Sequence, residues 1–355
     1  HFMPEEEEAK GGGGGCDLFS GKWVRDYSLP PLYEEWECPY IDPQITCLEH
    51  GRPETDFRHW RWQPHGCSIP SFNSSLMLEA LRGKRMMFVG DSLTRGQFTS
   101  MVCLLHGIIH DDDKSFESHG SSTVFTAKGY DATIEFYWAP FLLESNADDP
   151  KWHRVTDRAI RNGSIDKHGE AWKGADILIF YTYIWWVKGL SILPSEGSIT
   201  DNDSMRVGIK MDDGYRLAMK SLVEWINENM DPRRQRAFFT SMSPSHQWSY
   251  RWGGANGGNC YNETTILEDE NFFGAERSLM RIASEELGRS EFPITFLNIT
   301  HLSSARKDAH TSIYQKKWGI PTEKLIADPA RLADCIHWCL PGLQDVWNQL
   351  LFSKL

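Results

Sequence analysis

The chain has 355 residues, of which 40% are hydrophobic and 24% are charged, so it can bury one large core or two modest ones. This composition excludes intrinsic disorder as the overall state. Because 49 acidic residues outnumber 37 basic ones and give a net charge of −12, we expect no nucleic-acid binding and no adhesion to an anionic membrane surface.

Residues 1–15 predict a flexible leader. The first three residues resemble an expression scar, and glutamates 5–8 and glycines 11–15 are typical of a linker. No apolar run in the sequence approaches the ~20 residues that a bilayer span needs. We therefore expect a soluble domain, and a segment upstream of it is expected to be missing.

Residues 16–75 predict an irregular N-terminal lobe. They are rich in tryptophan, proline, histidine and cysteine, and their apolar residues show no periodicity, so neither a helix bundle nor a sheet is expected. Such a segment depends on disulfide bonds and on the rest of the chain for stability. An even number of cysteines favours disulfides formed in an oxidising compartment. The eight cysteines are Cys16, Cys38, Cys47, Cys67, Cys103, Cys260, Cys335 and Cys339.

Residues 76–355 predict an α/β domain with a central parallel sheet. Short apolar runs alternate with amphipathic stretches, which is the pattern of strands and helices wound about such a sheet. The predicted strands span residues 85–89, 175–181, 237–241 and 294–297, and residues 123–126 and 132–138 predict a hairpin. Helices are predicted over residues 94–105, on the face formed by Tyr215, Met219, Leu222 and Ile226, and at Leu343, Trp347, Leu350 and Leu351.

A candidate nucleophile follows the first of these strands. Gly90-Asp91-Ser92-Leu93 leads from strand to helix, which places Ser92 at the carboxyl edge of a parallel sheet, where open α/β folds bind ligands. Gly90 permits a tight exit from the strand, and the first helical turn directs N–H groups towards a developing oxyanion. The alternative is that Asp91 and Ser92 simply cap the helix, since both residue types are favoured there.

A candidate base lies near the C-terminus. A serine hydroxyl needs a neighbouring proton acceptor, and Asp334 stands three residues before His337, a spacing at which an acid can orient an imidazole. Cys335 and Cys339 would hold this loop rigid. In the alternative interpretation Asp334 is a turn residue and His337 a buried histidine. Zinc at these cysteines and His337 is disfavoured because no nearby Cys-x-x-Cys completes a tetrahedral site, so no metal is expected.

Five Asn-x-Ser/Thr triplets are candidate glycosylation sites and agree with an oxidising compartment. Their asparagines are Asn73, Asn162, Asn202, Asn262 and Asn298.

Together, the Gly-Asp-Ser-Leu turn and the Asp-x-x-His segment resemble the two ends of a GDSL/SGNH hydrolase-type domain. Five segments further resemble the plant trichome birefringence-like family, over essentially the whole chain from Cys16 to Leu355. The segments are Cys16-Asp-Leu-Phe-Ser-Gly-Lys-Trp-Val, Trp60-Arg-Trp-Gln-Pro, Gly90-Asp-Ser-Leu, Ser241-Met-Ser-Pro-Ser-His and Asp334-Cys-Ile-His-Trp-Cys-Leu-Pro-Gly. Within that family, Thr94-Arg-Gly-Gln and Thr182-Tyr-Ile-Trp-Trp-Val look most similar to the eskimo-type xylan O-acetyltransferase.

The resemblance implies a three-layer α/β/α fold and a type II membrane protein of the Golgi lumen whose anchor is absent from this chain. It implies transfer of acetyl to xylosyl 2-O or 3-O hydroxyls of xylan through acetyl-Ser92, with His337 as base and Asp334 as its partner. No bound cofactor is expected, only an acetyl donor such as acetyl-CoA or an acylated carrier.

Two positions depart from the pattern of the resembled family. Tyr181-Thr182 stands where many relatives have Asn-Thr, and Gly96 often has asparagine in its place. The backbone N–H of Ser92 is therefore the one oxyanion donor that we assign.

A neutral polysaccharide is expected to bind through aromatic faces and polar edges. Candidates for these contacts are Arg95, Trp185, Trp186, Trp248, Trp252 and His310. Each has an alternative role, since most tryptophans are core residues and an arginine on a first helical turn is usually solvated. The polar stretch 306–310, which includes His310, is expected at the rim of the site.

The residues alone leave the disulfide pairing open. The expected pairing is Cys16 with Cys67, Cys38 with Cys103, Cys47 with Cys339 and Cys260 with Cys335. Two other functions stay open at this point: an acetylesterase that uses water as acceptor, and a polysaccharide-binding protein without chemistry. Labelling of Ser92 by a serine-directed reagent would exclude the last.

Overall fold

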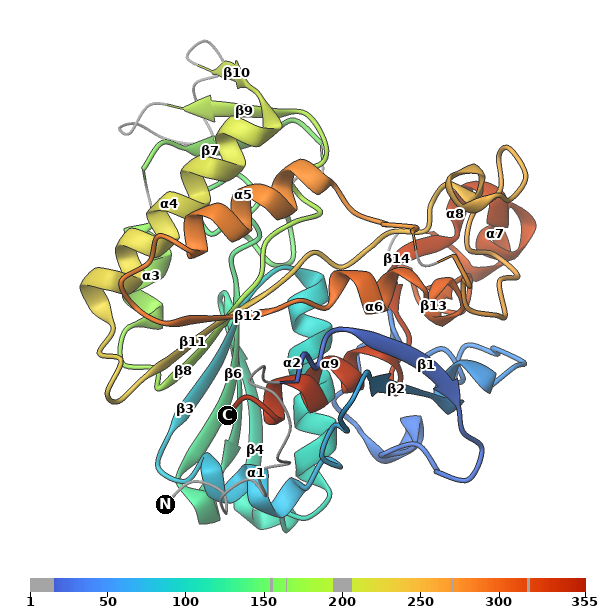
Figure 1. The fold of residues 1–355 in the computed structure, drawn as a ribbon, viewed down its shortest axis with the longest axis horizontal. Helices are drawn as coiled ribbons and strands as arrows, with labels where there is room; N and C mark the ends of the chain where they lie inside the picture. The colour runs from blue at the N-terminus through green and yellow to red at the C-terminus, as the bar shows by residue number, and fades with distance from the viewer. Residues whose placement is uncertain (1–15, 154–155, 164, 194–205, 270, 318–319) are drawn as a thin grey trace.

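A computed structural model describes residues 16–153, 156–163, 165–193, 206–269, 271–317 and 320–355. Its centre is a seven-stranded sheet with the order β12-β11-β8-β3-β6-β5-β4 (Figure 1). Five strands are parallel, and β5 and β4 extend one edge antiparallel, so the expected central parallel sheet is a mixed sheet at that edge. The strands are β3 (Arg85–Gly90), β4 (Lys114–His119), β5 (Ser122–Ala127), β6 (Ala132–Trp138), β8 (Ile177–Phe180), β11 (Arg236–Thr240) and β12 (Ile294–Leu297).

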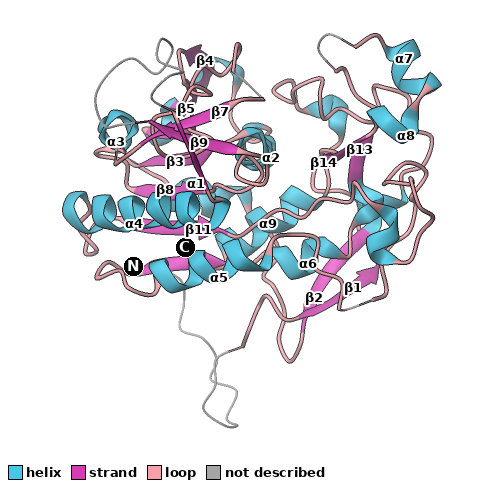
Figure 2. Cartoon of the chain, turned by 90° about the horizontal axis from the view of Figure 1, so that it is seen from above, coloured by secondary structure: helices cyan, strands magenta, loops and turns pink. Residues whose placement is uncertain are grey.

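Helices cover both faces of this sheet and make the expected three layers (Figures 1 and 2). One face carries α1 (Ser74–Ala80), α2 (Ser92–His106) and α9 (Leu343–Phe352), and the other carries α3 (Asp166–Trp172), α4 (Met211–Asn229) and α5 (Arg277–Leu287). Phe98 of α2 packs on Phe88 and Phe136, whereas Trp225 of α4 packs on the opposite face against Phe180. None of the helices in the described part of the chain is long and apolar enough to cross a membrane.

Each predicted strand and helix of residues 76–355 is present, with ends that shift by a few residues at most. The sequence did not predict the helices α1, α3 and α5, the outer strand β4 or several short elements. Three to six residues, the length of β4 and of the short elements, carry too little periodicity to identify a strand or helix. These short elements are β7 (Arg158–Arg161), β9 (Leu190–Leu193), β10 (Val207–Ile209), β13 (His310–Ser312), β14 (Asp334–Trp338), α6 (Thr300–Ser304), α7 (Thr322–Ala327) and α8 (Pro329–Leu332).

The N-terminal lobe is less irregular than predicted, because β1 (Gly21–Arg25) and β2 (Trp60–Pro64) form an antiparallel pair. Phe57 and Trp62 of the lobe belong to the same buried cluster as the residues of the central sheet, so the lobe shares the core of the α/β domain. The four disulfides have the expected pairing. Cys38–Cys103 ties the lobe to α2, and Cys47–Cys339 ties it to the segment after β14.

A buried carboxyl group completes the seam between the lobe and the helices. Asp345 of α9 accepts hydrogen bonds from the Tyr33 hydroxyl (2.8 Å) of the lobe and from Ser100 (2.6 Å) of α2. The Gly342 backbone N–H donates a third bond at 2.7 Å. Burial raises the pKa of Asp345 to about 6, although these three hydrogen bonds oppose the shift.

The raised pKa of Asp345 predicts a pH-dependent stability. The group stabilises the fold fully below its unfolded pKa, and this contribution is lost as the pH rises towards about 6. Relative to Asp345→Asn, which does not titrate, the wild type should therefore lose about 2 kcal/mol of unfolding free energy between pH 4 and pH 7. Denaturant titrations at both pH values measure this difference. Asp112→Asn, at a carboxylate that is 94% exposed, is the control, and a difference independent of pH would contradict the assignment.

Candidate active site

The candidate nucleophile lies where the central strand of the sheet turns into a helix. β3 ends at Gly90, and Ser92 is the first residue of α2. A side chain at position 90 would place a Cβ 2.5 Å from the carbonyl oxygen of Tyr181, so the turn needs glycine. Asp91 caps the helix, since its carboxylate accepts the N–H of Leu93 at 2.9 Å. Asp91 therefore caps the helix, and Ser92 next to it remains the candidate nucleophile.

The structure brings the three predicted residues of the triad together in one hydrogen-bonded row. Ser92 Oγ lies 2.8 Å from His337 Nε2, and His337 Nδ1 lies 2.7 Å from Asp334 Oδ2. Nδ1 donates to the carboxylate, which leaves the lone pair of Nε2 to accept the proton of the serine hydroxyl. This is the arrangement that activates a serine for nucleophilic attack.

The carboxylate of this row is held in its ionised form. Burial by itself would raise the pKa of Asp334, but the charge and hydrogen bond of His337 outweigh it. The backbone N–H groups of Ile336 and His337 add two bonds to Oδ1, each at 3.0 Å. The net pKa lies well below the ordinary value, so Asp334 remains negative and can stabilise an imidazolium at His337.

The backbone N–H of Ser92, at the start of α2, remains the expected oxyanion donor, because the first N–H groups of a helix have no acceptor within it. The hydroxyl of Thr182 does not supply a second one, since it donates to the Pro140 carbonyl (2.7 Å) and accepts from Trp186 Nε1 (2.7 Å). Asparagine could not replace Gly96 without movement, because a Cβ there would lie 2.3 Å from the amide oxygen of Gln344. The departure at position 96 from the resembled family therefore has a packing explanation.

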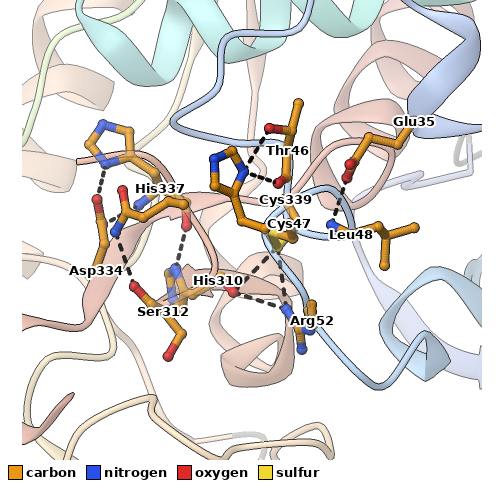
Figure 3. The surroundings of a disulfide bond; sticks show 12 residues. Glu35, Thr46, Cys47, Leu48, Arg52, His310, Ser312, Asp334, His337 and Cys339 are labelled. Atoms are coloured by element: carbon orange, nitrogen blue, oxygen red, sulfur yellow. Dashed lines mark hydrogen bonds and ion pairs between the residues drawn. A yellow bond between two sulfur atoms is a disulfide. The ribbon is translucent and has the colours of Figure 1, made fainter. Parts of the chain in front are cut away.

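The triad histidine stands on a strand that covalent and polar contacts hold in place (Figure 3). The segment carrying Asp334 and His337 is strand β14 and not the predicted loop. Its two flanking cysteines are buried and bonded to Cys260 and Cys47. Arg52 of the lobe donates to the His310 carbonyl at 3.0 Å, on the strand paired with β14.

A buried histidine pair lies beside the main chain of His337. His310 Nδ1 donates to the backbone carbonyl of His337 at 3.0 Å, and His310 Nε2 lies 2.7 Å from His246 Nδ1. Burial lowers the pKa of His246 to about 4 and that of His310 well below its ordinary value, so both rings are neutral at pH 7. The pair fixes the main chain of His337 without reaching Ser92. His246 was present in a motif noted from the sequence, but no local pattern identified this role.

Several residues expected to contact substrate lie in the interior. Trp186 is fully buried against Phe141 and Tyr215, and Trp185 is only 5% exposed. His310 is also buried. Contrary to expectation, these three side chains are core residues, because aromatic side chains at the end of a central strand pack against the elements that cover it.

The stretch 306–310 is likewise interior and not at the rim. Arg306 and Asp308 are each 1% exposed and form a salt bridge of 2.9 Å with each other. Because the two charges neutralise one another, a polar sequence is tolerated inside the fold. Trp248, in contrast, is 54% exposed, and Trp252 packs its edge against His246.

Two polar side chains, Arg95 and Gln44, lie beside the Ser92–His337 pair. Arg95, an expected substrate contact, is partly exposed one turn after Ser92 and donates to the amide oxygen of Gln44 (3.2 Å). The amide nitrogen of Gln44 lies 3.4 Å from His337 Nδ1. No sequence pattern identified Gln44, because its neighbours in space are remote along the chain.

The zinc alternative loses its ligands, because Cys335 and Cys339 are both in disulfides. No cluster of histidine, cysteine and acidic residues suited to a metal occurs among the described residues. Of the predicted glycosylation sites, Asn73, Asn162 and Asn262 are exposed, whereas Asn298 is partly buried. Asn202 lies outside the described residues.

Comparison with known proteins identifies two family models along the chain. Residues 14–68 match the PMR5 N-terminal domain, and residues 69–354 match the PC-Esterase model, described as a GDSL/SGNH-like acyl-esterase family found in Pmr5 and Cas1p. Probable xylan O-acetyltransferase 10 of Oryza sativa subsp. japonica is 54% identical over 96% of this chain and 78% of its own length. Protein trichome birefringence-like 35 of Arabidopsis thaliana is 46% identical over 96% and 76%, and xylan O-acetyltransferase 12 of rice is 43% identical over 96% and 69%.

Because the Cys47–Cys339 disulfide holds the end of β14, we expect it to be required for the position of His337. Replacing Cys47 and Cys339 together by serine should slow labelling of Ser92 by a fluorophosphonate about 10- to 100-fold, because a displacement of His337 by ~1 Å removes its hydrogen bond to the serine. The matched control replaces Cys16 and Cys67, whose bridge lies within the lobe, and should label at the wild-type rate. Circular dichroism monitors the fold of both variants. Equal labelling of the two variants would show that the bridge does not position the histidine.

Proposed function

The chain belongs to the GDSL/SGNH-like acyl-esterase family found in Pmr5 and Cas1p, and from this membership we propose that it is a polysaccharide O-acetyltransferase. Its acceptor is xylan, acetylated at the 2-O or 3-O hydroxyl of xylosyl residues. The observation that carries the proposal is the hydrogen-bonded row of Ser92, His337 and Asp334 at the edge of the sheet. The acceptor is supported by the names of similar proteins, which include xylan O-acetyltransferases.

In the first half of the proposed reaction, Ser92 Oγ attacks the carbonyl carbon of an acetyl donor. His337 Nε2 takes the hydroxyl proton, and the charge of Asp334 stabilises the imidazolium. The backbone N–H of Ser92 stabilises the oxyanion of the tetrahedral intermediate. Collapse breaks the bond to the leaving group, which receives the proton from His337, and acetyl-Ser92 remains. The donor is an activated ester or thioester, such as acetyl-CoA or an acylated carrier, and no bound cofactor takes part.

In the second half, a xylosyl hydroxyl takes the place that the leaving group vacated. His337 accepts its proton while the sugar oxygen attacks the acetyl carbon, and a second tetrahedral intermediate forms. Its collapse releases the acetylated sugar and returns the proton to Ser92 Oγ. This is double displacement, and the same three residues serve both halves.

Hydrolysis is the second candidate function, because water can attack acetyl-Ser92 in the same way and the family description is that of acyl-esterases. Transfer prevails where the site holds the sugar hydroxyl in attack geometry and limits productive water. The two functions therefore share the triad and differ in the wall that receives the acceptor.

The proposal includes a location in the Golgi lumen, with a membrane anchor N-terminal to this chain. Four disulfides support an oxidising compartment. Asn73, Asn162 and Asn262 are the proposed glycan acceptors, because their exposed positions leave room for a glycan.

Alanine at Ser92, His337 or Asp334 should each lower acetyl transfer to xylo-oligosaccharides, the first two by about 10⁴-fold or more. Pairs of these changes should cost little more than one, because the residues act as a unit. Mass spectrometry of the oligosaccharides measures transfer, and Ser68→Ala, at an exposed serine, is the matched control. Substantial transfer by Ser92→Ala would contradict the covalent mechanism.

A further inference from the structure

The helix that carries the nucleophile offers two side chains to the surface. All residues of α2 are buried except Ser92 and Arg95. Residues three apart on a helix lie on the same face, so the guanidinium of Arg95 and the nucleophile share one opening. The side chain of Arg95 is 32% exposed, which leaves N–H donors accessible beside Ser92.

The N-terminal lobe holds Arg95 at this opening. Arg95 Nη2 donates to Gln44 Oε1 at 3.2 Å and lies 3.9 Å from the carboxylate of Asp42. Asp42 in turn accepts the backbone N–H of Gln44 at 2.8 Å, which fixes the turn that carries both residues. Because Asp42 balances the charge of Arg95, the group suits a neutral ligand better than an anionic one.

The amide oxygen of Gln44 accepts a hydrogen bond from Arg95, whereas its amide nitrogen can still donate to a ligand. Its nitrogen lies 3.4 Å from His337 Nδ1, which already donates its proton to Asp334. Two donors that face each other form no hydrogen bond, so the N–H groups of Gln44 remain available to an acceptor atom. Asp42 is 33% exposed and provides a carboxylate oxygen that can accept. The cluster thus offers both donors and an acceptor, as a sugar hydroxyl requires.

The turn that carries Asp42 and Gln44 is tied to the catalytic domain on both sides. Pro43 accepts the N–H of Lys316 at 2.9 Å, and Ile45 accepts the N–H of Leu340 at 3.1 Å. The Cys47–Cys339 bridge follows two residues later. A rigid support of this kind is what a binding wall needs to place a hydroxyl within a fraction of an ångström.

We propose that Asp42, Gln44 and Arg95 form the wall that binds the acceptor sugar and so favours transfer over hydrolysis. This inference rests on the proposed function and specifies its acceptor side. The three residues bind hydroxyl groups of a neutral pyranose and place the reacting hydroxyl between acetyl-Ser92 and His337 Nε2. The lobe is then part of the active site and not only a covering of the core.

The test measures how acetyl-enzyme partitions between sugar and water. Wild type and variants receive a chromogenic acetyl ester with and without xylo-oligosaccharide, and the ratio of acetylated sugar to free acetate is determined. Gln44→Ala should lower this ratio about 10-fold and raise the KM for the oligosaccharide, because it removes a bond made to the sugar and not to water. Arg95→Lys, which keeps the charge but loses the fork of donors, should lower it less than Arg95→Ala.

Gln63→Ala is the matched control, since Gln63 lies in β2 of the same lobe and away from the triad. Its ratio should equal that of the wild type. If Gln44→Ala and Arg95→Ala reduce transfer and hydrolysis equally, so that the ratio is unchanged, the inference is overturned while the proposed function stands. A wild type that releases acetate but transfers to no sugar would overturn the proposed function and this inference with it.

Discussion

The geometry of the candidate active site depends on one contact, the 2.8 Å hydrogen bond between Ser92 and His337, which joins residues 245 positions apart. A serine at the end of a central strand is placed by the sheet alone, but nothing local holds a histidine opposite to it. Strand β14 holds the histidine in place. The two cysteines on either side of His337 are bonded to Cys47 of the lobe and to Cys260. Two disulfides, which restrict the conformations of the chain, and the pairing of β14 with β13 thereby position the imidazole of His337.

The same constraint explains why so many polar groups are buried on this side of the molecule. Arg52 of the lobe donates to the His310 carbonyl, and the His310 ring donates to the His337 carbonyl. Buried polar groups cost free energy unless they are hydrogen-bonded, so these bonds offset part of that cost while they restrict the main chain of His337. The lobe therefore helps to hold the segment around His337 in place, in addition to sharing the core of the α/β domain.

Much of this was predictable from the sequence because the signals are local. The apolar runs at residues 132–138 and 294–297 coincide with β6 and β12, and the turn at Ser92 follows directly from strand, glycine and helix. Gln44 was not predictable, since it meets His337 across 293 residues. Trp186 and the stretch 306–310 are buried because other parts of the chain pack on them in the folded structure, and amino-acid composition does not predict that packing.

The most direct test of the account is whether acetyl passes through Ser92. Enzyme mixed with an acetyl donor and quenched within milliseconds to seconds is digested, and the peptide that contains Ser92 is analysed by mass spectrometry. The account predicts one acetyl group on Ser92 that disappears when xylo-oligosaccharide is added and is recovered on the sugar. Continued transfer without any acetyl-Ser92, under conditions that trap a stable ester, would contradict it.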